Sequence, residues 1–384
     1  MKAHICSCYN IDMRTYKYRL YPTTEQKACL ENTLETCRSL YNAALAERRY
    51  AYRQQRKNIG RLQQLNELPC MKESILELQQ VHSQVLQDVL IRVDKAFDAF
   101  FRRLRSDDKP GYPRFRGKGW YDSFTYPQSG FSLSDNKPGN QKLKLSKIGK
   151  VRIRIHRPIE GKIKTCTIKR EIDNWYVCFS CEVEPNPLPK FYKAAGVDMG
   201  ILSFATLSDG STIENPSFLQ QSESKLKHEQ RSLSRKKKGS NSRKKQKVKL
   251  ARLHRKVANQ RKDFLHQESR KLVNAYDTLV FENLRVKNMV KNHHLAKPIF
   301  DASWSRFIRY CVYKAESAGK QVILVNPRGT SQICSNCGSM VKKSLAVRIH
   351  KCPDCGLEID RDMNAAINIL RLGTSLGGAS ALAG

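Results

Sequence analysis

Four of the thirteen cysteines are spaced like the ligands of a metal ion. They form two Cys-x₂-Cys pairs, Cys334 with Cys337 and Cys352 with Cys355, separated by fourteen residues, and a glycine follows each pair. Four thiolates at this spacing can close a tetrahedral shell around Zn²⁺, which lets a segment too short for its own core fold. Four unrelated buried thiols would seldom fall in two such pairs. We therefore predict one structural zinc ion in a ribbon over residues 331–357.

Three acidic residues lie at the ends of apolar segments. Asp198 lies in Ala-Gly-Val-Asp-Met-Gly, and Glu282 ends Thr-Leu-Val-Phe-Glu. Asp362 falls in the first turn of a segment with strong helical character. Taken singly, each has a structural explanation: a turn, solvation at a strand end, and a favourable charge at a helix N-terminus. Taken together, they also suit a chemical role. An RNase H-like sheet brings the end of its first strand, the end of its fourth strand and the start of its last helix to one edge.

Three carboxylates at one sheet edge can hold two Mg²⁺ ions. Such ions, ~3.5–4 Å apart, activate a water molecule and stabilise the leaving oxygen of an in-line phosphodiester displacement. No Ser/His or Cys/His arrangement offers a competing nucleophile. Asp360 is the nearest alternative for the third position, and Asp362 is preferred because residues 364–366 continue at the spacing of a packed helix.

The first elements of the chain are a strand and a helical region. Residues 16–21 alternate as a half-buried strand does, and Pro22 ends the run. Between Thr24 and Arg105 the apolar residues recur at helical spacing. This spacing predicts three or four helices, with the first break between Gly60 and Pro69.

A loop and a set of short strands follow. Residues 109–121 mix Pro and Gly with basic and aromatic residues, which predicts a loop that faces nucleic acid. The β-rich runs after it are separated by turn residues, as in a small barrel or sheet. One face of the run from Trp175 to Val183 is apolar throughout and is expected to be core. The predicted strands cover residues 124–131, 142–145, 151–155, 163–168 and 175–183.

From residue 194 the order becomes strand, helix, strand, helix, which predicts an α/β domain with an insertion. Within the insertion, residues 225–262 carry seventeen basic residues and one acidic residue, Glu229. Apolar residues at helical spacing run through the same segment. We expect a helical hairpin, broken near residues 239–241, that lies along a phosphate backbone. The other predicted elements cover residues 196–207, 278–281, 302–318, 321–325 and 362–370.

The composition favours an anionic partner. The 384-residue chain has 70 Lys and Arg against 35 Asp and Glu, a formal charge of +35, which nucleic acid can neutralise. A membrane is disfavoured because the basic residues run through the whole chain, and no segment reaches the ~18–20 apolar residues of a spanning helix. The odd number of cysteines and the absence of a signal-like apolar run argue against secretion. We therefore expect an intracellular protein.

Several motifs together resemble those of the TnpB (OrfB) proteins of insertion sequences, which are relatives of type V CRISPR effectors. The resemblance runs from Tyr16 to Leu370, nearly the whole chain. One departure is the Phe-Glu-Asn-Leu around Glu282, where many relatives have Glu-Asp or Glu-His, but the acid itself is retained. The most specific motifs are Tyr-Arg-Leu-Tyr-Pro at 18–22, Gly-Tyr-Pro-Arg-Phe-Arg at 111–116, Gly-Val-Asp-Met-Gly at 196–200, Thr-Ser-Gln-Ile-Cys at 330–334 and Asp-Arg-Asp-Met-Asn-Ala-Ala at 360–366.

The resemblance implies an RNA-guided DNA endonuclease with a RuvC-type site, in which Asp198, Glu282 and Asp362 are the catalytic triad and hold Mg²⁺. It implies that the four cysteines bind zinc. It also implies a guide RNA from the element's own transcript, double-stranded target DNA, and a short flanking DNA motif read by the N-terminal lobe. In such a scheme base pairing reads the sequence, while the protein reads the flanking motif and the heteroduplex backbone. The expected assembly is a monomeric ribonucleoprotein, and the resemblance implies a cytoplasmic, nucleoid-associated protein of a prokaryote.

The expected fold is α+β and multidomain. A helical recognition lobe is inserted in a small β-barrel (wedge) domain, and an RNase H-like (RuvC) α/β domain with a zinc-ribbon insertion follows. The expected ranges are 1–12 for a disordered leader, 13–22 and 107–190 for the barrel, 23–106 for the helical lobe, 191–330 and 358–372 for the nuclease domain with its basic insertion at 218–274, 331–357 for the zinc ribbon, and 373–384 for a disordered tail.

Contacts with nucleic acid are expected from basic and polar side chains of the first helix, a later helix, the basic loop and the basic insertion. For each of them a solvated surface position is an equally good explanation. These residues are Arg38, Tyr41, Asn42, Gln87, Arg114, Arg116, Lys118, Thr125, Arg235, Lys236, Lys237 and Lys238.

Three other functions compete with the nuclease. A nuclease-inactive RNA-guided repressor should have lost at least one acid, and all three acids are present. A transposase that cuts and joins ends needs a DDE site or a catalytic tyrosine, and the sequence shows neither a His-x-His partner for a tyrosine nor a second catalytic domain. A transposase accessory protein without guide RNA is a related alternative. A zinc-ribbon RNA-binding protein of translation accounts for the charge and the zinc but not for the three acids.

Overall fold

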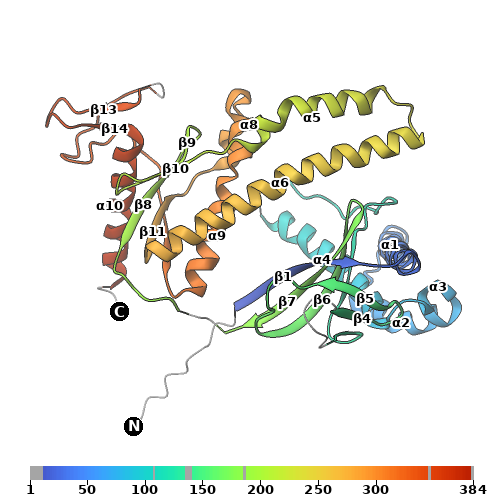
Figure 1. Ribbon diagram of the computed structural model, residues 1–384. Helices are drawn as coiled ribbons and strands as arrows, with labels where there is room; N and C mark the ends of the chain where they lie inside the picture. Colours follow the sequence, from blue (N-terminus) through green and yellow to red (C-terminus); the bar gives the residue numbers. More distant parts are fainter. Residues whose placement is uncertain (1–11, 107–108, 135–140, 185–186, 345–346, 382–384) are drawn as a thin grey trace, which may run out of the picture. The chain divides into compact units, whose positions relative to one another are not determined.

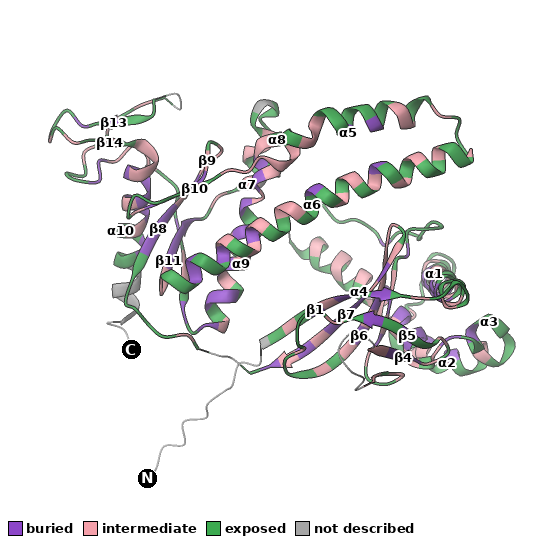
Figure 2. Cartoon of the chain, in the orientation of Figure 1, coloured by how far each residue is buried: buried purple, intermediate pink, exposed green. Residues whose placement is uncertain are grey.

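Two units, Met1–Glu184 and Pro185–Gly384, are each built around a hydrophobic core of their own (Figure 2). The computed structural model describes residues 12–106, 109–134, 141–184, 187–344 and 347–381. The expected leader lies outside these ranges except for Asp12, which is the first residue of strand β1 (Asp12–Tyr21). Across the described ranges, no helix combines the length and the hydropathy that crossing a bilayer requires.

Seven antiparallel strands form a nearly closed β-barrel in the first unit (Figure 1). Their order is β2-β6-β7-β1-β5-β4-β3. In β7 every second residue from Trp175 to Val183 is buried, so the predicted core face is confirmed. The strands after β1 are β2 (Ser123–Tyr126), β3 (Phe131–Leu133), β4 (Lys142–Leu145), β5 (Gly149–Arg154), β6 (Lys162–Glu171) and β7 (Asn174–Val183).

The helical region holds α1 (Thr24–Gln55), α2 (Arg61–Ser74), α3 (Leu76–Gln79) and α4 (Ser83–Arg105). The predicted number of helices is confirmed, but the expectation that Pro69 helps to break them is wrong, because Pro69 lies inside α2. Contacts with α1 help to hold α2 in place near Pro69. The buried Gln64 of α2 donates a hydrogen bond of 3.0 Å to the carbonyl of Ala44, and Leu68 is buried beside Pro69. Tertiary packing therefore outweighs the helix-breaking tendency of proline.

The second unit has a five-stranded sheet in the order β10-β9-β8-β11-β12. Strands β8 (Ala194–Met199), β9 (Ser203–Leu207) and β10 (Thr212–Glu214) are antiparallel neighbours, while β11 (Thr278–Glu282) and β12 (Gln321–Val325) run parallel to β8. The run predicted as one strand over residues 196–207 is two strands. Gly200 allows the turn between them, because a Cβ there would lie 2.6 Å from the carbonyl oxygen of Ser203.

Helix α10 (Arg361–Ala381) lies directly on this sheet. A Cβ on Gly196 of β8 would meet the carbonyl oxygen of Ala366 at 2.1 Å, and one on Gly373 would meet Val280 of β11 at 2.5 Å. The expectation of disorder after Gly373 is wrong as far as Ala381, because glycine at 373 lets the helix continue in close contact with the strand. Residues 382–384 lie outside the described part of the chain.

The basic insertion forms the predicted hairpin of α5 (Phe218–Arg235) and α6 (Asn241–Ala275), with the break at the expected place. Ser240 caps α6 by accepting a hydrogen bond of 3.1 Å from the backbone N–H of Arg243. After it come α7 (Val286–Met289), α8 (His293–Ala302) and α9 (Trp304–Ser317), where a left-handed Ser303 separates the last two. Strands β13 (Ile349–Lys351) and β14 (Glu358–Asp360) form a short hairpin.

Candidate active site and metal centre

The three acids come from three elements that meet at one edge of the five-stranded sheet. Strands β8 and β11 are parallel neighbours with Val197 opposite Phe281, so Asp198 and Glu282 are the next residues along each strand. Asp362 lies in the first turn of α10. The glycine contact at residue 196 brings α10 against β8 two residues before Asp198. The local sequence thus delivers all three carboxylates to the same end of the sheet.

The electrostatics show that these carboxylates sense one another. Burial and the negative charges of Glu282 and Asp362 together raise the pKa of Asp198 to about 8, while the positive charge of Arg361 opposes the rise. Burial also raises the pKa of Glu282, and the hydroxyl of Thr330 opposes that rise by donating a hydrogen bond. Two neighbouring acids with raised pKa values form a site that a bound cation would stabilise.

The structure gives Asp360 and Asp362 different surroundings. The Oδ1 of Asp360 accepts hydrogen bonds from the backbone N–H groups of Asp362 (2.8 Å) and Met363 (3.0 Å), so it caps the N-terminus of α10. The carboxylate of Asp362 has Arg348 and Arg361 at 3.9 Å, the outer limit of an ion pair. Asp360 therefore has a structural role at the helix N-terminus. The negative charges of Asp362 and Asp360 both raise the pKa of Asp198, and that of Asp362 has the larger effect.

The four predicted zinc ligands are gathered in one place. Their sulfur atoms all lie within 4.8 Å of one another, with Cys334 Sγ 3.7 Å from Cys355 Sγ and Cys337 Sγ 3.5 Å from Cys352 Sγ. A tetrahedron with Zn–S bonds of ~2.3 Å has edges of ~3.8 Å, so the cluster fits one zinc ion. Among the described residues this is the one group of three or more His, Cys, Asp or Glu side chains gathered so closely, and the three acids are therefore more widely spaced.

The glycine after each cysteine pair has a conformational reason. Gly338 and Gly356 have φ values of 83° and 70°, in the left-handed region that favours glycine. Their N–H groups each bond at 3.0 Å to the carbonyl of the first cysteine of the pair, Cys334 or Cys352. The two turns are therefore built alike, as the shared sequence pattern predicts.

The basic loop is fastened to helix α1 by residues that were expected to contact nucleic acid. The amide of Asn42 accepts from the backbone N–H of Arg116 at 2.8 Å and donates to its carbonyl at 3.0 Å. Arg38 donates to the same carbonyl at 3.0 Å, and the guanidinium of Arg116 lies 5.5 Å from the ring centre of Tyr41. These four residues come together, but the polar groups of Asn42 are already occupied within the protein.

The other expected contact residues are scattered over the first unit. Thr125 lies on β2, where its hydroxyl accepts from Arg92 at 2.8 Å and lies 2.9 Å from the hydroxyl of Thr167. Gln87 on α4 and the loop residues Arg114 and Lys118 are exposed. The sequence interpretation did not single out Trp120, although this indole is 78% exposed in the same loop.

A buried acidic residue holds the two helices of the basic hairpin together. Glu229 of α5 is buried, and its carboxylate accepts from Gln246 at 2.6 Å and pairs with Lys249 at 2.8 Å, both on α6. Of the four residues expected to bind phosphates here, Arg235, Lys237 and Lys238 are exposed, whereas Lys236 is partly covered and donates to Ser242. The positive charges therefore remain at the surface while the negative charge joins the two helices.

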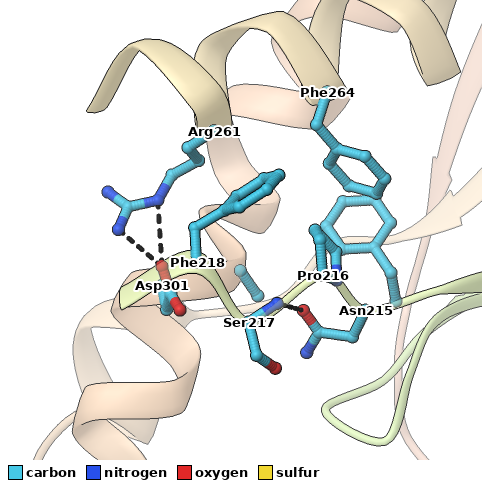
Figure 3. Close-up of a pocket in the computed structure, with 9 residues that line it drawn as sticks. Asn215, Pro216, Ser217, Phe218, Arg261, Phe264 and Asp301 are labelled. Carbon is cyan, nitrogen blue, oxygen red and sulfur yellow. Dashed lines mark hydrogen bonds and ion pairs between the residues drawn. The ribbon is translucent and has the colours of Figure 1, made fainter. Parts of the chain in front are cut away.

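Asp301 of α8 attaches this hairpin to the rest of the second unit (Figure 3). Its Oδ1 accepts from Arg261 Nη2 at 2.6 Å and from Nε at 3.2 Å, and its Oδ2 accepts from the backbone N–H of Leu219 at 2.9 Å. One carboxylate thus holds α6 and the first turn of α5. The hollow beside it is lined by the rings of Phe204, Phe218 and Phe264.

Known structures define the fold class. The cryo-EM structure of a Cas12f1–sgRNA–target DNA complex matches with a TM-score of 0.58 at 14% identity, covering 94% of this chain and 99% of that chain. At this identity the likeness concerns the fold alone. Family models match residues 178–293 ("OrfB_IS605: Probable transposase"), 304–369 ("Cas12f1-like, TNB domain") and 13–57 ("Helix-turn-helix domain"). In the last range the structure has one strand and one long helix, β1 and α1.

Sequence relatives define the family. A "Putative RNA-guided DNA endonuclease" of Streptomyces pristinaespiralis is 37% identical over 369 residues, which cover 94% of this chain and 89% of the relative. The "Putative RNA-guided DNA endonuclease InsQ" of Escherichia coli (strain K12) is 32% identical over 380 residues, covering 94% and 92%. This chain belongs to the TnpB (OrfB) family of insertion-sequence proteins.

Proposed function

We propose that this chain is an RNA-guided DNA endonuclease of a transposable element, which cleaves target DNA beside a short flanking motif. The observation that carries the proposal is the meeting of Asp198, Glu282 and Asp362 at one sheet edge, where the pKa of Asp198 is raised to about 8 by burial and by the other two acids. The relatives named as RNA-guided DNA endonucleases support the same activity. A guide RNA and double-stranded target DNA are the partners that this activity requires.

The site suits magnesium-dependent hydrolysis of the RuvC type. Its ligands would be carboxylate oxygens, which Mg²⁺ prefers, and three carboxylates at one sheet edge can be shared between two ions. The bound ions would supply an activated water and charge stabilisation on the leaving oxygen. Asp198 and Glu282 orient their carboxylates from neighbouring strands, and Asp362 completes the site from α10. The strand order, in which the first strand lies beside the second and the fourth, supports an RNase H-like domain.

The division of labour along the chain follows from this assignment. We assign the barrel of residues 13–22 and 107–190 and the helical lobe of residues 23–106 to recognition of the flanking motif. Residues 191–330 and 358–372 form the nuclease domain, with the basic insertion at 218–274 along nucleic acid and the zinc ribbon at 331–357. The charge of +35 supports a ribonucleoprotein, which we propose to be monomeric.

The experiment begins with the RNA that copurifies with the protein when it is expressed with its flanking transcript. Sequencing that RNA gives the guide, and a plasmid library with a complementary target beside a randomised flank gives the motif. The wild type should cut a subset of the library in Mg²⁺, and Asp198→Ala should abolish cutting while RNA binding stays unchanged. Full cutting by Asp198→Ala would overturn the triad, and RNA copurification without any cutting by the wild type would favour a repressor.

The description of the matching family model as a transposase favours a second function, the cutting and joining of element ends. This function predicts joined products when DNA carrying the element's ends is supplied without guide RNA. The nuclease predicts cleavage that follows the guide and no joining. The same purified protein can be given both substrates.

A further inference from the structure

Thr330 makes the closest polar contact of the candidate active site. Its side chain is buried, and its hydroxyl lies 2.5 Å from Oε1 of Glu282, a residue 48 positions earlier in the chain. A second acceptor, the carbonyl of Pro327, lies farther away at 3.3 Å. Because a hydroxyl has a single proton, the shorter contact with the carboxylate takes it.

The backbone around Thr330 is fixed by the turn that precedes the first cysteine. Strand β12 ends at Val325, which pairs with Glu282, so only eight residues separate this end of the sheet from Cys334. Within them the carbonyl of Gly329 accepts from the N–H groups of Gln332 and Ile333, each at 2.9 Å. The segment therefore cannot shift Thr330 without breaking this turn.

Two buried asparagines of α10 hold the same segment. Asn368 donates to the carbonyls of Thr330 at 2.9 Å and Ile333 at 2.7 Å. One turn earlier, Asn364 donates to the carbonyl of Ile333 at 2.8 Å and accepts from the N–H of Ser335 at 2.9 Å. Burying an amide is unfavourable unless it is hydrogen-bonded, and the side chains of Asn364 and Asn368 both bond to this one segment.

These contacts join two of the three acids through one helix. Helix α10 carries Asp362 in its first turn, and Asn364 and Asn368 lie on its next turns. Through them α10 fixes the backbone of Thr330, whose hydroxyl in turn fixes Glu282. The position of Glu282 relative to Asp362 is thus set by hydrogen bonds as well as by the sheet.

We propose that Thr330 is a positioning residue of the active site, which fixes the carboxylate of Glu282 for metal binding. The proposal rests on the proposed function, because it concerns the same three acids. The hydroxyl bonds to Oε1 and so restricts the rotation of the carboxylate, which would leave the other lone pairs of Glu282 available to a metal ion. Outer partners of metal ligands typically change metal affinity or activity by ~10–100-fold when removed.

Thr330→Val and Thr330→Ser form the matched pair that tests this role. Valine keeps the shape of threonine and loses the hydroxyl, whereas serine keeps the hydroxyl. The readout is Mn²⁺ binding to the purified full chain, followed by electron paramagnetic resonance of the free ion, with the melting temperature measured alongside. Valine should weaken Mn²⁺ binding by ~10–100-fold and serine should restore it. Thr374→Val is the control, because Thr374 is exposed on the same helix and bonds only to its own helix turn.

The outcomes separate this inference from the proposed function. Equal Mn²⁺ affinity of wild type and Thr330→Val overturns the positioning role, even if the wild type cuts DNA. If the wild type binds Mn²⁺ but cuts no DNA, the proposed nuclease function is contradicted. The Mn²⁺ affinities of the wild type and Thr330→Val still decide whether Thr330 positions Glu282. In the Glu282→Gln background, Thr330→Val should cause no further loss, and an undiminished loss there also overturns the role. If valine disturbs folding, Thr330→Ser against Thr330→Ala makes the same comparison with smaller side chains.

Discussion

Asp198 has a pKa that differs strongly between the folded and the unfolded chain. Its folded-state pKa is raised to about 8 by burial and by its two acidic neighbours. An unfolded aspartate has a pKa of ~3.9. Between pH ~4 and ~8 the folded chain therefore keeps a proton that the unfolded chain has released, and stability falls as the pH rises through this window.

Asp198→Asn should remove this dependence, because asparagine has nearly the same shape and stays neutral. Without Mg²⁺, the melting temperature of the wild type should fall relative to that of Asp198→Asn as the pH rises from 5 to 8. Added Mg²⁺ should raise the melting temperature of the wild type but not that of the variant. Thermal unfolding at four pH values measures this, in dialysed protein without chelator, since a chelator would also remove zinc. A constant difference between the two proteins across the series would contradict the raised pKa.

Single residues could be predicted from the sequence where a short local pattern marks them. The cysteine pairs, and the acids at the ends of apolar runs, are visible within a few positions. Thr330 begins the motif at residues 330–334, but its partner Glu282 is 48 positions away, and Asn368 bonds to a segment 38 positions away. Hydrogen bonds over such separations have no periodic signature in the sequence, so no pattern could have revealed them.

Helices and strands were predicted well where one face is apolar. They were predicted poorly where contacts with other elements determine where they begin and end. The alternation in β7 and the break of the basic hairpin were confirmed. Pro69 inside α2 and the continuation of α10 beyond Gly373 were not expected, because both depend on contacts with other elements. The division at Ser303 into α8 and α9 was also not expected, because a left-handed residue leaves no mark on the apolar spacing.

The zinc ribbon is an element that metal should hold together. We expect one tightly bound zinc per chain, lost in Cys352→Ser, because three thiolates no longer close the tetrahedral shell. Elemental analysis measures the metal, and limited proteolysis should show new cleavage between residues 334 and 355 in the variant. Cys70→Ser is the control, as Cys70 is exposed on α2. Purified wild type without zinc would contradict the assignment.

The attachment of the hairpin can be tested at Asp301. Asp301→Ala removes the acceptor of Arg261 and of the N–H of Leu219, and should lower the free energy of unfolding by about 1–3 kcal/mol because partly buried donors lose their partner. Hydrogen exchange should rise first in α5. Removal of the more exposed pair between Glu268 and Lys271 by Glu268→Ala should have an effect of at most ~1 kcal/mol. Equal exchange in both variants would argue against Asp301 as the anchor.

For the whole molecule, composition alone predicted the class of partner, and the structure shows how the charge is arranged within the basic insertion. The segment of residues 225–262 has one acid, and that acid is buried between α5 and α6. The negative charge of this acid therefore does not offset the positive charges at the surface of the segment. Such a surface repels itself until an anionic chain lies along it.

The last prediction concerns this surface. If the hairpin lies on phosphates, replacing Arg235, Lys236, Lys237 and Lys238 with glutamine should weaken binding of every nucleic-acid sequence alike, while recognition of the flanking motif survives. Each lost phosphate contact should also reduce the slope of log affinity against log salt by ~0.7–0.9, because each contact releases condensed counterions.

The control exchanges lysine and arginine at the same four positions, which keeps the charge and should keep the slope. The binding of the copurified guide RNA and of target duplex is measured across a salt series for the wild type, the glutamine variant and the charge-preserving control. Because Lys236 donates to Ser242 within the hairpin, its contribution should be the smallest of the four, and the slope should change by about three contacts rather than four. Parallel lines for the glutamine variant and the wild type would mean that these charges face only solvent, and that the anionic partner of the chain binds elsewhere.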